Sequence, residues 1–183
     1  KLMGLLQEGE VTMGGPRVSQ LAATGDATAF EFPRGLMQDP SFDFSFSGLK
    51  TSVLYQVRDL ADEELDAQKA DIAASFEDAV VDVLAHKTIA AAKAAGVDKI
   101  LLSGGVAANR HLRAELDARA QAQGQCVYNP PPALCTDNAA MIAAVGSFRM
   151  RNGERSDLTL NANPRLVLPG RRERQGEPCA TST

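Results

Sequence analysis

The stretch Leu101-Leu-Ser-Gly-Gly-Val-Ala-Ala-Asn109 decides the fold of this chain. The residues Lys99–Leu102 predict a short buried strand, because all of them except Lys99 are apolar. From Arg110 onward the pattern becomes helical, since Leu112 and Leu116 lie four residues apart with charges between them. The stretch is therefore a strand, a glycine turn and a helix start, which is typical of an α/β fold.

The turn within this stretch has the features of a ligand-binding loop. Gly104 and Gly105 permit positive φ and carry no Cβ, so a ligand can approach the backbone closely. The helix that follows offers free N–H groups, which favour a phosphate or a carboxylate. Asn109 stands at the N-cap position, and its amide can equally turn toward a ligand. A turn that only redirects the chain is the open alternative.

Composition places the chain among globular proteins. It has 183 residues, of which 44% are hydrophobic and 23% charged, and its apolar runs are too short to span a membrane. Three cysteines without a Cys-x-x-Cys pair give no disulfide framework, which favours an intracellular protein with reduced thiols. The first residue is Lys1 rather than methionine, so we expect a piece of a longer protein.

Charge gives one candidate contact for a polyanion. The net charge of −4 does not indicate wholesale nucleic-acid binding. Residues 149–174, however, hold seven arginines and three carboxylates, a local charge of +4. A solvated chain end explains such a run equally well.

Periodicity and turn residues predict the other elements. Alternation of Phe42, Phe44 and Phe46 with polar residues predicts a half-buried strand, and Ser47 is the predicted N-cap of the next helix. Residues 61–68 read as an acidic connector, and Gly96 ends the longest helix. The predicted helices cover residues 16–23, 47–60, 71–95, 110–123 and 139–149, and a further strand covers 126–128.

Two groups of polar residues on the longest helix receive structural interpretations. Glu77, Asp78 and Asp82 are interpreted as a solvated face. His86 is a lone histidine, for which a surface or packing role is expected rather than metal ligation.

Four loops each lead into a helix, where ligand sites of α/β folds concentrate. They are Gly14-Gly15, Ser47–Lys50, Ser103–Asn109 and Thr136–Asn138. Gly104-Gly105 and Asp137 follow two strands separated by one helix, and a parallel sheet would place both at one edge. Helix capping is the alternative role of Asp137.

Three motifs, read together, resemble the TsaD/Gcp family. These are Phe44–Thr51, Ser103–Arg110 and Cys135–Asn138, and the resemblance runs from Lys1 to about Pro169. Members are tRNA adenosine threonylcarbamoyltransferases, once described as O-sialoglycoprotein endopeptidases. Two departures are Gly35, where the family usually has proline, and Ala139, where it usually has glycine.

The resemblance implies an α/β fold that is the C-terminal lobe of an actin/hexokinase/Hsp70-like (ASKHA) ATPase. A helical and strand insertion would lie at its N-terminal side. Residues 1–60 would form an inter-lobe segment with the Gly-Gly-Pro and Ser-Gly-Leu-Lys loops. Residues 61–170 would form the nucleotide-binding lobe, and residues 171–183 a disordered tail.

The resemblance also implies roles for single residues. Gly15, Gly104, Gly105 and Asn109 would bind the substrate nucleotide, and Asp137 would ligate one divalent metal ion, iron in the first place or zinc. The other ligands in the family are histidines of a His-x-x-x-His motif in the N-terminal lobe, which this chain lacks. No residue is assigned a catalytic role of its own, because direct transfer needs no covalent nucleophile.

The implied activity is transfer of the threonylcarbamoyl group of threonylcarbamoyl-AMP to the adenosine adjacent to the anticodon of tRNA. Implied partners are tRNA, threonylcarbamoyl-AMP or ATP, and the accessory proteins TsaB and TsaE; no membrane is involved, and the location is cytoplasmic. We expect residues 1–183 alone to be an inactive part of this acyltransferase. A truncated, non-catalytic paralogue that binds nucleotides or partners is the alternative. A metalloprotease is poorly supported, since no His-Glu-x-x-His occurs.

Overall fold

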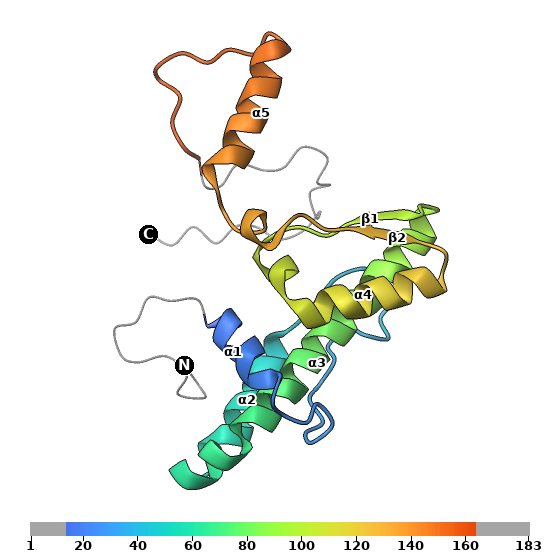
Figure 1. Cartoon of the computed structure of the whole chain (residues 1–183), viewed down its shortest axis with the longest axis vertical. Coiled ribbons are helices and arrows are strands. Elements are labelled where there is room, and N and C mark those ends of the chain that lie inside the picture. The colour runs from blue at the N-terminus through green and yellow to red at the C-terminus, as the bar shows by residue number, and fades with distance from the viewer. Residues whose placement is uncertain (1–13, 164–183) are drawn as a thin grey trace, which may run out of the picture. The chain divides into compact units, whose positions relative to one another are not determined.

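The computed structural model of the chain describes residues 14–163 and divides the chain into two compact units, Lys1–Asn138 and Ala139–Thr183. The first unit holds most of the regular structure (Figure 1). Its helices are α1 (Gly15–Ala22), α2 (Ser47–Arg58), α3 (Asp62–Ala95) and α4 (Arg110–Ala122). Its strands are β1 (Lys99–Leu101) and β2 (Cys126–Tyr128), and its 3-10 turns are η1 (Gly105–Ala108) and η2 (Pro132–Leu134). The second unit holds α5 (Ala139–Arg151).

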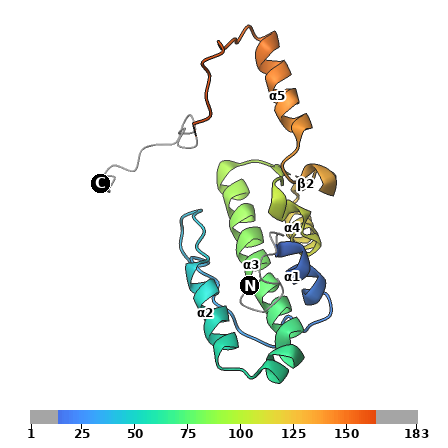
Figure 2. The same cartoon turned by 90° about the vertical axis from the view of Figure 1, so that its left-hand side faces the viewer.

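Helix α3 is the element on which the rest of the first unit packs. Helix α2 lies along one side of it, and α1 and α4 lie along the other (Figure 2). The stripe Leu49, Val53 and Val57 of α2 is buried against Ile72 and Ala79 of α3. The helix itself confirms the one predicted over residues 47–60.

The start of α3 corrects one prediction. Residues 61–68, predicted to be a connector, are helical from Asp62 onward. The Glu64 carboxylate accepts a hydrogen bond from the Ala61 N–H at 3.1 Å, and three acidic residues occupy the first turn. Both features stabilise a helix N-terminus, so the acidic composition that suggested a loop in fact begins the helix. The helix ends at Gly96, whose φ of 65° confirms the predicted C-terminal glycine.

The two strands pair in parallel, with Ile100 opposite Val127. Helix α4 connects them, and its Leu116 packs with Ile100 and with Ala85 of α3. None of the described residues covers the opposite face of this small sheet, where Leu101 is 82% exposed. This arrangement confirms the α/β class and the parallel pairing predicted around the glycine turn.

The strand predicted at residues 42–46 does not form. Phe42 and Phe44 are each 49% exposed, and the segment is irregular. Within residues 14–163 the sheet consists of β1 and β2 alone, so this segment has no neighbouring strand to satisfy its backbone groups. The buried Lys87 ammonium instead binds the carbonyl oxygens of Asp39 and Ser41. Ser47 is the first residue of α2 and makes no side-chain cap, which corrects that prediction too.

Other boundaries remain predictions. The division predicted at residue 60 falls beside a core cluster that joins residues on both of its sides, from Phe32 to Ile72. The predicted tail, residues 171–183, lies outside the described residues. None of the helices between residues 14 and 163 is long and apolar enough to cross a bilayer.

Candidate functional site

The glycine turn lies at the carboxyl end of β1 and leaves its backbone open. Gly104 has a φ of 96°, a conformation that L side chains rarely adopt, so this position requires glycine. A Cβ at Gly104 or Gly105 would meet no described atom within 4 Å. The N–H of Ala107 returns to the Gly104 carbonyl at 3.0 Å and closes η1. The backbone at Gly104 and Gly105 is therefore not packed against another described element, whereas Ala107 at the end of the turn is buried.

Asn109 ends the turn and caps α4, as predicted. Its Oδ1 accepts a hydrogen bond from the Leu112 N–H at 2.8 Å. Its Nδ2 donates to Glu77 Oε1 at 2.6 Å and lies 3.1 Å from Ser19 Oγ. Ser19 Oγ itself donates to Glu77 Oε1 at 2.6 Å. One carboxylate oxygen of α3 thus holds the end of the glycine turn and helix α1 together.

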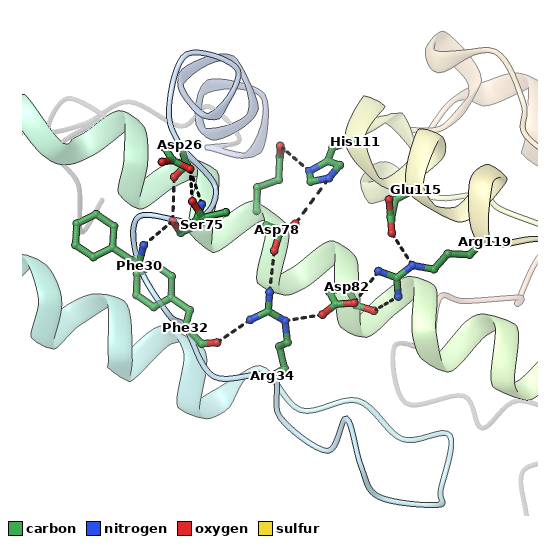
Figure 3. Close-up of polar contacts among 12 residues, drawn as sticks. Asp26, Phe30, Phe32, Arg34, Ser75, Asp78, Asp82, His111, Glu115 and Arg119 are labelled. Carbon is green, nitrogen blue, oxygen red and sulfur yellow. Dashed lines mark hydrogen bonds and ion pairs between the residues drawn. The ribbon is translucent and has the colours of Figure 1, made fainter.

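The acidic residues of α3 are not a solvated face, which corrects the prediction for Glu77, Asp78 and Asp82. We call these three the carboxylate ridge. Arg34 Nη2 lies 2.8 Å from Asp78 Oδ2, and its Nε lies 2.6 Å from Asp82 Oδ2. Figure 3 shows the Arg34 guanidinium between these two carboxylates. The ridge therefore fastens the segment after α1 to α3.

Helix α4 brings two further side chains, Arg119 and His111, to the carboxylate ridge. Arg119 joins Asp82 at 2.7 Å and Glu115 at 2.6 Å (Figure 3). His111 Nδ1 lies 3.7 Å from Glu77 Oε2, and its Nε2 lies 3.9 Å from Asp78 Oδ1. Partial burial raises the pKa of Asp82, but hydrogen bonds from Arg119 and Arg34 outweigh this effect and hold it below its ordinary value. Asp82 is therefore a charged anchor of α4 rather than a proton donor.

Gly15 opens α1 and is exposed. Helix α1 packs through Ala22 against Ala73 and Ala74 of α3. Ser19 lies one turn after Gly15 and shares the Glu77 oxygen with Asn109. The structure thus anchors the helix that carries Gly15 and the turn that carries Asn109 to the same side chain.

Arg113 of α4 connects the glycine turn with the loop that leads to Asp137. Its Nε donates to the Ala107 carbonyl oxygen. Its Nη2 lies 2.9 Å from the Pro130 carbonyl oxygen and 3.1 Å from the buried Cys135 Sγ. The turn after β1 and the loop after β2 are therefore held by one guanidinium, as expected for loops at one edge of a parallel sheet.

Asp137 itself is exposed, two residues beyond Cys135. Between residues 14 and 163, no three His, Cys, Asp or Glu side chains gather closely enough to hold a metal ion. An exposed carboxylate fits one ligand position of a shared site, so most of the ligands would have to come from outside the described residues. The Ser47–Lys50 motif is not held by the contacts that join the glycine turn to the loop before Asp137. Its Leu49 packs in the core between α2 and α3.

Sequence reasoning missed Arg34, Arg113 and Arg119, and it assigned Glu77 to a solvated face. Most of the contacts that define their roles join residues far apart in the chain, up to 58 residues for Glu77 and Ser19. A helical face with three carboxylates is normally solvated, and nothing local in the sequence shows that distant cations cover it.

The chain is similar in sequence to known proteins of one family. A family model described as TsaD, tRNA N6-adenosine threonylcarbamoyltransferase, matches residues 2–144. Curated relatives with this name include one from Symbiobacterium thermophilum, 52% identical over 155 residues, and one from Paracidovorax citrulli, 51% identical over 158 residues. Each alignment covers 85% of this chain and 45% of the relative, so the chain spans less than half the length of these relatives. With the family model matching most of its residues, the chain belongs to the TsaD family of tRNA N6-adenosine threonylcarbamoyltransferases.

Proposed function

We propose that this chain is the C-terminal part of an enzyme that transfers the threonylcarbamoyl group of threonylcarbamoyl-AMP to the adenosine next to the anticodon in tRNA. The observation that carries the proposal is the family match over residues 2–144, which includes the open glycine turn after β1. In this reading the chain is the C-terminal lobe of an ASKHA-type fold, and the cleft for the nucleotide lies between this lobe and a second one.

The geometry supports a role for each predicted substrate residue. The backbone at Gly104 and Gly105 would face the phosphate, since the turn is open and precedes the N-terminus of α4. Asn109 and Gly15 would contact the nucleotide from the end of the turn and from the start of α1. In the reaction the adenosine N6 amine attacks the carbamoyl carbon, the bond from that carbon to the phosphate oxygen breaks, and AMP leaves. The amine loses a proton, and no enzyme nucleophile takes part.

Asp137 would supply one ligand to a divalent metal ion, iron in the first place or zinc, with the other ligands outside this chain. A cation held there would neutralise phosphate charge and polarise the acyl group. What Asp137 itself contributes is a negative charge on a loop that Arg113 ties to the glycine turn through Pro130 and Cys135.

The partners that go with this proposal are tRNA and the accessory proteins TsaB and TsaE, in the cytoplasm. A two-lobe cleft encloses its nucleotide, and one lobe alone leaves the nucleotide in water, where electrostatic stabilisation of the transfer is weak. We therefore expect residues 1–183 alone to leave tRNA unmodified.

The test compares two proteins. One is residues 1–183, and the other is the same chain joined to the upstream half of the Symbiobacterium thermophilum relative. Each is incubated with unmodified tRNA, threonylcarbamoyl-AMP and the accessory proteins, and the digested tRNA is searched for the modified nucleoside by mass spectrometry. The intact relative is the positive control.

Product from the joined chain alone is the expected result. Product from residues 1–183 would refute the two-lobe argument. If the intact relative is active and the joined chain is not, this chain does not supply a working half, and the non-catalytic binding module becomes the better reading.

A further inference from the structure

The hydrogen bonds around Asn109 determine which of its atoms remains available to a ligand. A backbone N–H can only donate, so the atom facing Leu112 N must be the carboxamide oxygen. An ionised carboxylate can only accept, so the atom facing Glu77 Oε1 must be the amide nitrogen. The chemistry of its two neighbours therefore fixes the orientation of the Asn109 side chain.

This orientation determines which further hydrogen bonds the Asn109 side chain can make. Nδ2 has two hydrogens, one directed to Glu77 Oε1 at 2.6 Å and one to Ser19 Oγ at 3.1 Å. Oδ1 has two lone pairs, of which Leu112 N uses one. One lone pair on Oδ1 is left. A phosphate oxygen cannot donate to it, whereas a ribose hydroxyl or the adenine amino group can.

Glu77 is suited to holding this orientation. Its side chain is only 13% exposed, and it projects from the middle of the 34-residue helix α3. Its Oε1 accepts from both Asn109 and Ser19 at 2.6 Å, lengths typical of strong charge-assisted bonds. On its other oxygen, Glu77 faces His111, whose Nδ1 lies 3.7 Å from Oε2, and His111 Nε2 lies 3.9 Å from Asp78 Oδ1.

We propose that Glu77 is a positioning residue that orients Asn109 so that its Oδ1 accepts a hydrogen bond from the nucleoside part of the substrate. The inference rests on the proposed function and deepens it, because it assigns the phosphate and the nucleoside of the substrate to two different parts of the site. The backbone of the glycine turn receives the phosphate, and Asn109 reads a hydroxyl or amino donor.

The first experiment measures AMP binding to the intact protein by calorimetry for wild type, Glu77→Ala, Asn109→Ala and the double variant. Asn109→Ala should weaken binding by about 5- to 150-fold and Glu77→Ala by about 3- to 10-fold. Because Glu77 acts through Asn109, the double variant should bind about as weakly as Asn109→Ala alone. Asp82→Ala is the matched control, since it removes another paired carboxylate of α3 that binds arginines rather than Asn109. It should lower the melting temperature and leave AMP affinity unchanged.

A second experiment exchanges the two side chains. Asn109→Asp places a carboxylate against Glu77 and should bind AMP more weakly than Asn109→Ala. Adding Glu77→Gln restores an amide–carboxylate pair, in which the amide of residue 77 now donates to the carboxylate of residue 109. The other oxygen of residue 109 remains an acceptor. The exchanged pair should recover at least about tenfold in affinity over Asn109→Asp, by the strength of a charge-assisted bond. This pair also serves if Glu77→Ala fails to fold.

A third experiment identifies the donor. AMP is compared with 2′-deoxy-AMP, 3′-deoxy-AMP and purine riboside monophosphate, each of which lacks one donor. Asn109→Ala should have no effect on the analogue that lacks the group read by Oδ1. Equal weakening for all of them would overturn the inference.

The results distinguish a failure of the substrate role of Asn109 from a failure of the positioning role of Glu77. If Asn109→Ala leaves AMP affinity unchanged, the substrate role of Asn109 in the proposed function fails. If Asn109→Ala weakens binding but Glu77→Ala does not, or if the two losses add, Glu77 is not a positioning residue while the proposed function stands.

Discussion

Gly25 marks a close approach between the segment after α1 and the backbone of α3. A Cβ at this position would meet the carbonyl group of Ala70 and lie 2.7 Å from Asp71 N. Comfortable contacts between heavy atoms are about 3.5–4.0 Å. Since the atoms in the way belong to a helix backbone, they cannot turn aside as a flexible side chain would. Gly25→Ala must therefore push the segment away from α3 by about 1 Å or more.

This displacement acts on a local hydrogen-bond network. The Asp26 N–H donates to Asp71 Oδ1 at 2.8 Å, and Ser75 Oγ donates to the Asp26 carbonyl at 3.2 Å. Ser75 Oγ also accepts from the Phe30 N–H at 3.1 Å, and Figure 3 shows these residues together. Overpacking costs about 1–3 kcal/mol, and a stretched hydrogen bond adds about 1 kcal/mol. We expect Gly25→Ala to lower the free energy of unfolding by about 2–4 kcal/mol.

The assay is urea unfolding of residues 1–183 followed by far-ultraviolet circular dichroism. With a slope of about 2 kcal/mol per molar urea, the midpoint should fall by about 1–2 M. Gly48→Ala is the matched control, because it lies in α2 with nothing within 4 Å of its Cβ position. Alanine there should raise the free energy of unfolding by up to about 1 kcal/mol. A Gly25→Ala midpoint equal to that of wild type would show that residue 25 does not press on α3.

Three further predictions concern buried or exposed charges. Since Arg119 and Arg34 hold the pKa of Asp82 below its ordinary value against the effect of burial, wild type should be more stable than Asp82→Asn above about pH 5. This advantage should vanish as the pH falls below about 4, which melting curves between pH 2.5 and 7 would show. Lys87→Met removes an ammonium that binds two backbone carbonyls, so it should lower the free energy of unfolding by about 1–3 kcal/mol. It should also speed limited proteolysis near residues 39–41, and an unchanged cleavage rate would contradict this. Asp137→Asn should reduce bound metal in the intact protein, measured by elemental analysis, with the melting temperature unchanged; equal metal content would exclude Asp137 as a ligand.

Short-range signals made much of the fold predictable. The strand, glycine turn and helix around residues 99–122 follow from local apolar spacing, from the conformational freedom of Gly104 and from the capping preference of Asn109. Gly96 ends α3 for the same kind of reason. Each of these choices is decided within a few residues of chain, so the sequence alone carries the information.

Long-range pairing explains what could not be predicted. Asp82 has the same local pattern whether it faces water or Arg34 and Arg119, which lie 48 and 37 residues away. The alternation of Phe42, Phe44 and Phe46 is suited to a strand, but a strand also requires a partner, and Lys87 binds the neighbouring carbonyls instead. The roles of Gly15, Gly104, Gly105, Asn109 and Asp137 toward ligands remain predictions, because the position of a residue in the fold does not by itself specify what it binds.

The spacing of contacts along α3 limits how the length of this helix can change. Ile72, Glu77, Asp82 and Lys87 lie five residues apart and contact the α2 stripe, Asn109, the two arginines and the loop at 39–41, respectively. Five residues turn an α-helix by about 140° beyond a full turn, which is why successive members face different neighbours. Deleting one residue between Ile72 and Lys87 would rotate every later contact by about 100° and shift it by about 1.5 Å. Insertions and deletions inside this interval should therefore be far more damaging than substitutions at its exposed positions, even where no single side chain there is essential.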